Sequence, residues 1–216
     1  MDWLKFIIPG IMLWVFNTPG LNAQNEIYLI RHAKVNLRTP GRINYKTVIV
    51  HRQAYDQSPI VDFDAAEVLA KIDLYNEIDT VFVSPQMRAR QTAIQIFGNR
   101  VHYRIDSGLK ELDYPIVCIP LVIMPKPVWL GLSRATWMMG VNTQGIPTLK
   151  EEMEKLKIVA NELIIYARRN QRTVVIAHGM VNRQLRKILK RSGWKVMHSE
   201  GHTNLAVNKL VFQQNN

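Results

Sequence analysis

The sequence of 216 residues carries a formal net charge of +11, is 47% hydrophobic and contains one cysteine. A single cysteine excludes an internal disulfide and a cysteine-based zinc site. The positive charge favours anionic partners, namely phosphorylated substrates, membrane surfaces or nucleic acid. Because the sequence has no nucleic-acid-binding motif and no basic stretch interleaved with aromatic residues, we do not expect a nucleic-acid partner.

Residues 1–23 have the pattern of a signal peptide. A short charged start is followed by the apolar stretch 6–16 and by a polar segment that ends at Ala23. The apolar stretch is short for a bilayer span. We therefore expect cleavage after Ala23, export to the periplasm or the extracellular space, and a mature domain of residues 24–216. An uncleaved membrane anchor is the alternative, because Leu21 is large for its position two residues before the cleavage site.

The first element of the mature chain is an apolar run over residues 27–30, which predicts a buried strand that ends in Arg31 and His32. In open α/β sheets, ligands bind beyond the carboxyl ends of the strands. We therefore expect Arg31 and His32 to lie at a ligand site. A histidine at a strand end is also a common packing or capping residue, so this feature alone is not specific.

A second predicted strand, 80–83, leads into a helix expected over residues 86–97, with Pro85 favouring the first turn. Arg88 then lies within one turn of the helix N-terminus, where free N–H groups and the helix dipole favour an anion. Its guanidinium group matches the geometry of phosphate oxygens. Taken alone, Arg88 and Arg90 would be read as a solvated helix face.

The C-terminal half repeats the strand pattern. Residues 173–177 form a third apolar run, which ends in His178. The clearest helix is expected over residues 149–169, where Thr148 and Glu151 form a possible capping box. The remaining predicted elements are a strand at 101–105, helices at 63–75 and 181–191, and a closing strand at 204–211. Strands that alternate with helices in this way predict a three-layer α/β/α sandwich around a mainly parallel sheet.

Four segments in this order resemble the histidine phosphatase superfamily, the phosphoglycerate mutase-like proteins. They are Leu29-Ile-Arg-His-Ala33, Val83-Ser-Pro-Gln-Met-Arg-Ala-Arg-Gln-Thr92, Leu109-Lys-Glu-Leu-Asp113 and Ala177-His-Gly179. The resemblance covers roughly residues 26–212. One departure is Ala33, which stands where the family usually has glycine. Alanine is small enough to allow the close approach of a phosphate if its φ is negative.

The resemblance implies a role for each matching residue. His32 would be the nucleophile that forms a phosphohistidine, and Arg31, Arg88 and His178 would hold the transferring phosphoryl group. Glu111 would be the proton donor, with Asp113 as the alternative. A carboxyl group near arginines needs partial burial to keep its pKa high enough for this role. Neither a metal ion nor a cofactor is implied.

The resemblance thus implies a phosphomonoester hydrolase that acts on a phosphorylated small molecule. Two alternatives stay open at this point. One is a mutase-like phosphoryl transferase, and the other is a non-catalytic module that binds a phosphorylated ligand or a membrane. The retention of all five core residues favours an enzyme. The sequence leaves the natural substrate and the oligomeric state open.

An apolar, proline-rich insertion follows the predicted acid, over residues 114–146. Its four prolines exclude a regular transmembrane helix across it. It could simply pack on the domain, or it could form a lid, because its place after Glu111 puts it near the active site in this fold. A third possibility is contact with a membrane surface through Trp129 and Trp137, helped by the positive charge.

Overall fold

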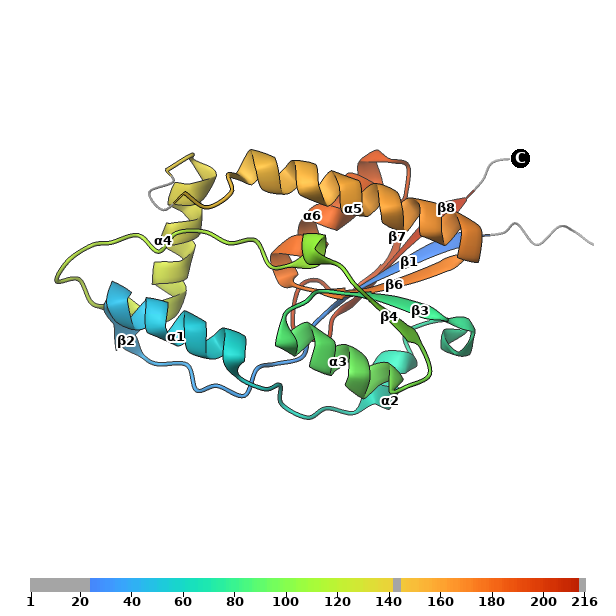
Figure 1. Ribbon diagram of the computed structural model, residues 1–216, viewed down its shortest axis with the longest axis horizontal. Coiled ribbons are helices and arrows are strands. Elements are labelled where there is room, and N and C mark those ends of the chain that lie inside the picture. The colour runs from blue at the N-terminus through green and yellow to red at the C-terminus, as the bar shows by residue number, and fades with distance from the viewer. Residues whose placement is uncertain (1–23, 142–144, 214–216) are drawn as a thin grey trace, which may run out of the picture.

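The computed structural model describes residues 24–141 and 145–213 (Figure 1). The signal-peptide and anchor interpretations concern residues 1–23, which lie outside the described residues. The main sheet has six strands in the order β4-β3-β6-β1-β8-β7. In chain order these are β1 (Gln24–Arg31), β3 (Thr80–Val83), β4 (His102–Ile105), β6 (Arg172–Ala177), β7 (Lys195–Ser199) and β8 (Val207–Gln213).

Strands β4, β3, β6 and β1 pair in parallel, whereas β8 is antiparallel to both β1 and β7. The register pairs Arg31 of β1 with Ala177 of β6, and Val83 of β3 with Ile176 of β6. The chain therefore leaves these three strands at the same sheet edge. This register brings His32 and His178 together, as the strand-end pattern predicts.

Helices cover both faces of the sheet. Tyr28 and Ile30 of β1 pack in one core cluster with α2 (Ala65–Leu69) and α3 (Met87–Phe97). Ile27 and Leu29 pack in the other cluster with α5 (Leu149–Asn170) and α6 (Gly179–Arg191). In Figure 1 these two pairs of helices lie on opposite sides of the strands. The predicted three-layer sandwich around a mainly parallel sheet is therefore confirmed.

Three predicted helices match α3, α5 and α6 to within two residues at each end, and the capping box of Thr148 and Glu151 is present. The single helix predicted over residues 63–75 is wrong. Asp64 caps the short α2, and the chain then turns, with Leu74 in the left-handed region at φ 50°, before a 3-10 turn at Tyr75–Glu77. The closing strand β8 begins at Val207, three residues later than predicted.

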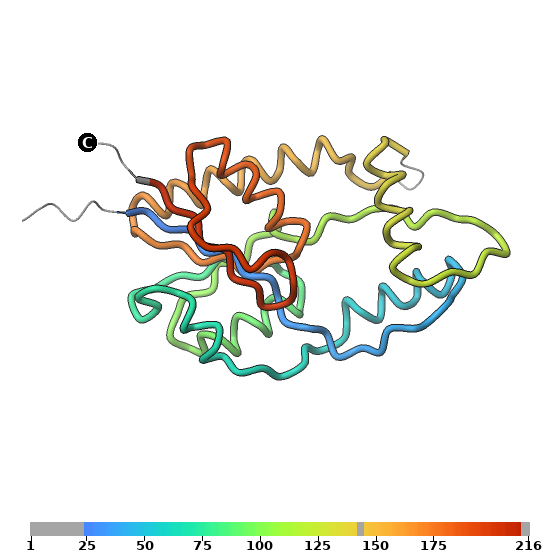
Figure 2. Tube along the Cα trace, turned by 180° about the vertical axis from the view of Figure 1, so that it is seen from behind, coloured from blue at the N-terminus to red at the C-terminus, as the bar shows by residue number. Residues whose placement is uncertain are grey.

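Two helices were not predicted from the sequence, namely α1 (Tyr45–Gln57) and α4 (Lys126–Met138). Both lie at one end of the molecule, away from the main sheet (Figures 1 and 2). They are accompanied by the two-stranded sheet of β2 (Arg42–Ile43) and β5 (Met124–Pro125). The remaining element is the 3-10 turn η2 (Ser107–Leu109). Within the described residues, no helix has the length and apolar character that a bilayer span requires.

The insertion packs through its tryptophans. Trp129 is fully buried and donates a hydrogen bond from Nε1 to the Ile43 carbonyl at 2.7 Å. Trp137 is 2% exposed and donates from Nε1 to the Pro147 carbonyl at 3.0 Å. The packing interpretation is confirmed for these two side chains. Since both indoles belong to the core, neither is available at the surface as the membrane-contact interpretation requires.

Candidate active site

A cleft of about 620 Å³ lies between the carboxyl edge of the sheet and the helices α1 and α4. Four of the five predicted site residues line it, namely Arg31, His32, Arg88 and Glu111. Insertion residues, among them Tyr114 and Arg134, line the same cleft. The placement of the insertion beside the site, as the lid interpretation expects, is therefore confirmed.

His32 is 2% exposed, and its Nδ1 lies 2.7 Å from the carbonyl oxygen of Ala33. A carbonyl only accepts, so Nδ1 carries the proton and Nε2 keeps its lone pair. Burial lowers the pKa of His32 to about 3, and the charges of Arg88 and Arg31 act in the same direction. The imidazole is therefore neutral at ordinary pH, as a nucleophile requires. Ala33 has a negative φ, so it meets the condition for replacing glycine.

The loop between β7 and β8 holds the end of β1 in place. The His202 carbonyl accepts a hydrogen bond from Nη1 of Arg31, and Asn204 donates from Nδ2 to the His32 carbonyl at 2.9 Å. The Nε of Arg31 is buried and finds no hydrogen-bond partner among the described residues. It is therefore a donor left for an anion in the cleft.

Arg88 lies in the first turn of α3, as predicted, and is 4% exposed. Its Nη1 donates to the Asp56 carboxylate of α1 at 2.6 Å, while its Nε is buried without a partner in the described part of the chain. Thr92, one turn later, accepts from the Ala33 N–H at 2.9 Å and donates to the Arg88 carbonyl at 2.6 Å. This hydroxyl ties the His32 loop to α3. Arg90 is exposed and does not line the cleft.

His178 is fully buried, with its ring centroid 5.1 Å from that of His32. Its Nε2 lies 2.8 Å from the Ser84 hydroxyl. Burial, followed by the charge of Arg88, lowers the pKa of His178 well below 6.5, so the ring is neutral. The structure thus brings His178 against His32 but not onto the wall of the cleft. Its Nδ1 has no partner within the described residues.

The two candidate acids differ in their surroundings. Burial raises the pKa of Glu111 above 4.5, outweighing the Leu112 N–H and the charge of Arg134, which lower it. A raised pKa keeps the proton that a general acid must give. Asp113 is instead ion-paired with Arg52, and its side chain is 46% exposed. The structure therefore favours Glu111 over Asp113 as the proton donor.

Several residues of the site were not predicted from the sequence. Thr92 could have been predicted from a local pattern, since it lies one helical turn after Arg88. Asp56, Ser84 and Asn204 could not, because only the fold brings each of them to its hydrogen-bond partner. Among the described residues, no cluster of three or more His, Cys, Asp or Glu side chains could hold a metal ion.

Solved structures with a similar fold include three phosphatases or hydrolases. Mycobacterial hydrolase 2 superposes with a TM-score of 0.56 at 16% identity, covering 89% of this chain and 84% of that one. A phosphoserine phosphatase from Entamoeba histolytica, in complex with 3-phosphoglyceric acid, gives 0.51 at 18% identity, covering 85% and 89%. Mycobacterial glucosyl-3-phosphoglycerate phosphatase gives 0.51 at 13%, covering 87% and 90%. No curated protein matches the sequence.

The model of the histidine phosphatase superfamily, branch 1, matches residues 27–216. That range contains His32 and His178 at the strand ends, the cleft residues Arg31 and Arg88, and the candidate acid Glu111. The chain therefore belongs to the histidine phosphatase superfamily, branch 1, and its activity is that of a phosphatase.

Proposed function

We propose that the enzyme hydrolyses phosphomonoesters of small molecules through a phosphohistidine on His32. The observation that carries this proposal is the neutral imidazole of His32, hydrogen-bonded through Nδ1, beside Arg31 and Arg88, whose Nε donors have no partner among the described residues. Those donors suit the equatorial oxygens of a phosphoryl group, on which charge accumulates during transfer.

The reaction has two steps. The Nε2 lone pair of His32 forms an N–P bond as the P–O bond to the leaving group breaks, and the leaving oxygen takes the proton of Glu111. A water then attacks phosphorus and gives a proton to Glu111, and the N–P bond breaks to release phosphate. Arg31 and Arg88 offset the charge of the phosphoryl group throughout. The neutral His178 packs beside His32 and helps to hold the nucleophile in place.

The test is a His32→Ala variant, with the exposed His198→Ala as the matched control. His32→Ala should lose turnover of an aryl phosphate and should form no acid-labile phosphoenzyme after rapid quenching, whereas His198→Ala should retain both. Inorganic phosphate should be the product, which separates a hydrolase from a mutase-like transferase. Turnover by His32→Ala near the wild-type rate would refute the mechanism.

We also propose that the enzyme is exported, with its mature chain beginning at Gln24. The signal-peptide pattern of residues 1–23 supports this. N-terminal sequencing of protein from the envelope or the medium of its host should begin at Gln24. Recovery of intact Met1 in a fraction that needs detergent would instead establish the uncleaved anchor.

Contact of the insertion with a membrane surface remains a further proposal. The two tryptophans do not support it, but exposed apolar side chains of the insertion do, namely Leu121, Ile123, Val128 and Met139. Together with the positive charge, they suit an anionic lipid surface. A Leu121→Asp/Ile123→Asp variant should bind anionic vesicles more weakly than the wild type. Equal binding by both proteins would disprove this contact.

A further inference from the structure

One face of α4 borders the catalytic cleft. Lys126, Leu130 and Arg134 follow one another at intervals of four residues, which places them on one side of a helix. All three line the cleft that holds His32 and Glu111. The insertion thus brings two cations to the wall of the cleft, with an apolar side chain between them.

The charge of Arg134 is not neutralised in the described part of the chain. Its guanidinium group lies 4.9 Å from the centroid of the Tyr114 ring, and its Nη2 donates to the Tyr114 hydroxyl at 3.4 Å. Its Nε is buried and has no partner among the described residues, and no carboxylate there lies within ion-pair distance. Such a guanidinium group retains donors for a carboxylate or a phosphate.

Lys126 likewise has no ion-pair partner among the described residues. Its Nζ lies 5.4 Å from the centroid of the Tyr55 ring, and no carboxylate of the described residues forms an ion pair with it. Burial lowers the pKa of Lys126 below 10.5. A bound anion would favour the charged form of this amine, so anion binding and the charge of Lys126 support each other.

The other side of the cleft is balanced differently. Arg88 is paired with Asp56, and Arg52 is paired with Asp113. Arg31 and Lys110 also line the cleft and form no ion pair among the described residues, but neither belongs to the insertion. Lys126 and Arg134 are therefore the cations without an ion pair that the described part of the insertion brings to the cleft. Of the charged side chains that lower the pKa of Glu111, Arg134 acts most strongly, ahead of Arg88 and Arg31. Arg134 therefore lies near enough to Glu111 for its charge to act on that carboxyl group.

We propose that Lys126 and Arg134 form a second anion site, and that the substrate is a phosphomonoester whose alcohol part carries another anionic group. That group is a carboxylate or a second phosphate. With the ester phosphate between Arg31 and Arg88, the second anion would lie against α4 and the leaving oxygen near Glu111. This inference rests on the proposed function and narrows its substrate class.

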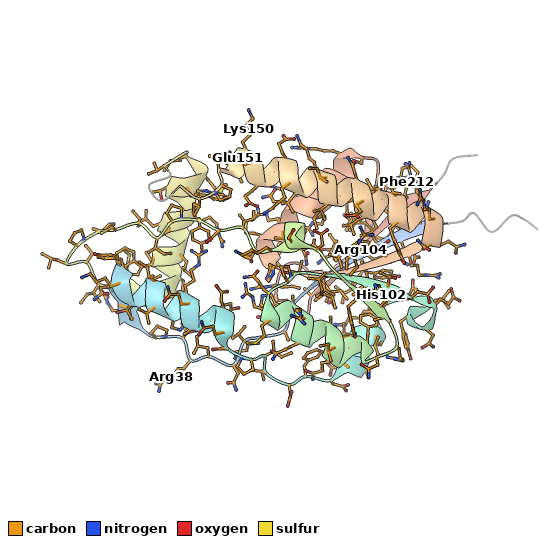
Figure 3. The ribbon with its side chains drawn as sticks, in the orientation of Figure 1. Arg38, His102, Arg104, Lys150, Glu151 and Phe212 are labelled. Carbon is orange, nitrogen blue, oxygen red and sulfur yellow. The ribbon has the colours of Figure 1, made fainter. Side chains whose placement is uncertain are left out.

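The experiment compares matched ligands that differ only in the second charge. The first pair is 3-phosphoglycerate and its methyl ester, and the second pair is propanediol bisphosphate and the monophosphate. Values of kcat/KM are measured for the wild type, Lys126→Met, Arg134→Met and the control Lys150→Met. Lys150 is exposed at the start of α5 and points away from the molecule (Figure 3).

The wild type and Lys150→Met should prefer the doubly anionic member of at least one pair. Arg134→Met should reduce this preference by about tenfold to a hundredfold, the value of one hydrogen bond to a charged group, and Lys126→Met should reduce it too. The pair that shows the effect identifies the anion as carboxylate or phosphate. No preference in the wild type, or an equal preference in all four proteins, would overturn the proposal.

A binding measurement separates this proposal from the proposed function. Calorimetry on His32→Ala, with and without Arg134→Met, reports the affinity for the same ligands in the absence of turnover. A loss of the preference for the doubly anionic ligand on adding Arg134→Met supports the second anion site even if no ester is hydrolysed. Equal affinities for both members of each pair would refute the site while leaving the phosphohistidine mechanism intact.

Discussion

Arg88 of α3 and Asp56 of α1 form an ion pair of 2.6 Å across the catalytic cleft. The Arg88 side chain is 4% exposed, and its guanidinium carbon lies 5.1 Å from the centroid of the Tyr55 ring, so two side chains of α1 contact it. The Nη1 donor of Arg88 is thereby used by Asp56, while the buried Nε, which has no partner among the described residues, remains for the substrate. A preorganised donor of this kind needs little rearrangement during phosphoryl transfer.

Removal of the Arg88 guanidinium group should slow the reaction strongly. Arg88→Ala should lower kcat/KM for an aryl phosphate by about 100- to 1000-fold, the effect of losing one preorganised electrostatic contact. Arg90→Ala is the control, because Arg90 belongs to the same helix but is exposed and outside the cleft. Steady-state kinetics of both variants decide the matter. Equal losses in the two would mean that Arg88 has no special role.

The pH dependence should separate the two acids. Because burial raises the pKa of Glu111, the protonated donor is lost only as the pH rises through that raised value. Because the pKa of His32 is about 3, the nucleophile stays unprotonated down to that pH. Turnover of an alkyl phosphate, which needs the proton, should therefore fall on the alkaline side, more steeply than that of a nitrophenyl phosphate.

Glu111→Gln should remove this difference between the two esters and slow the alkyl phosphate by about 100- to 10,000-fold, the usual contribution of a general acid. Asp113→Asn should retain the difference between the pH profiles of the alkyl and nitrophenyl phosphates. The second ionisation of the phosphate occurs at a lower pH in the nitrophenyl ester than in the alkyl ester, so each pH profile is first corrected for the ionisation of its own substrate. If Asp113→Asn, and not Glu111→Gln, abolished the difference, the proton donor would be Asp113.

The free energy of unfolding should fall on acidification. Burial lowers the pKa of His178 in the folded state, so below about pH 6.5 the unfolded chain binds a proton that the native state does not. This group alone contributes a slope of up to about 1.4 kcal/mol per pH unit. Denaturant unfolding of His178→Gln between about pH 4 and pH 6 should show that slope reduced. An unchanged slope in His178→Gln would contradict this account.

The insertion should stabilise the domain through its buried indoles. Trp129→Ala should lower the free energy of unfolding by about 3–5 kcal/mol, since it empties a fully buried site. Trp129→Phe keeps most of the volume but loses the hydrogen bond to Ile43, at about 1 kcal/mol. Met139→Ala, which truncates an exposed side chain of the same insertion, should change the free energy of unfolding by less than about 0.5 kcal/mol. A loss below about 1 kcal/mol for Trp129→Ala would show that this packing is dispensable.

Local patterns in the sequence predicted the layers of the fold and pointed to Arg31, His32, Arg88 and His178 as site residues, whereas Glu111 was predicted only from the family resemblance. The apolar runs that end in His32 and His178 could be recognised because a buried strand is a short continuous stretch. The capping box before α5 lies within four residues, so it too could be read directly. Where local signals were weak, prediction failed. The chain over residues 63–75 turns after Leu69, and the Asp73 N–H donates to the Tyr28 hydroxyl of a distant strand.

The sequence by itself determined the main strands, the helices α3, α5 and α6, and the side chains at the carboxyl edge of the sheet, because those properties depend on neighbours along the chain. Only the tertiary structure decided how the site works. The partners of Arg88, His178 and His32 lie 32, 94 and 172 residues away in Asp56, Ser84 and Asn204. The choice of Glu111 over Asp113 likewise depends on which carboxyl group the fold buries and which one it pairs with Arg52, because burial and ion pairing shift a pKa in opposite directions.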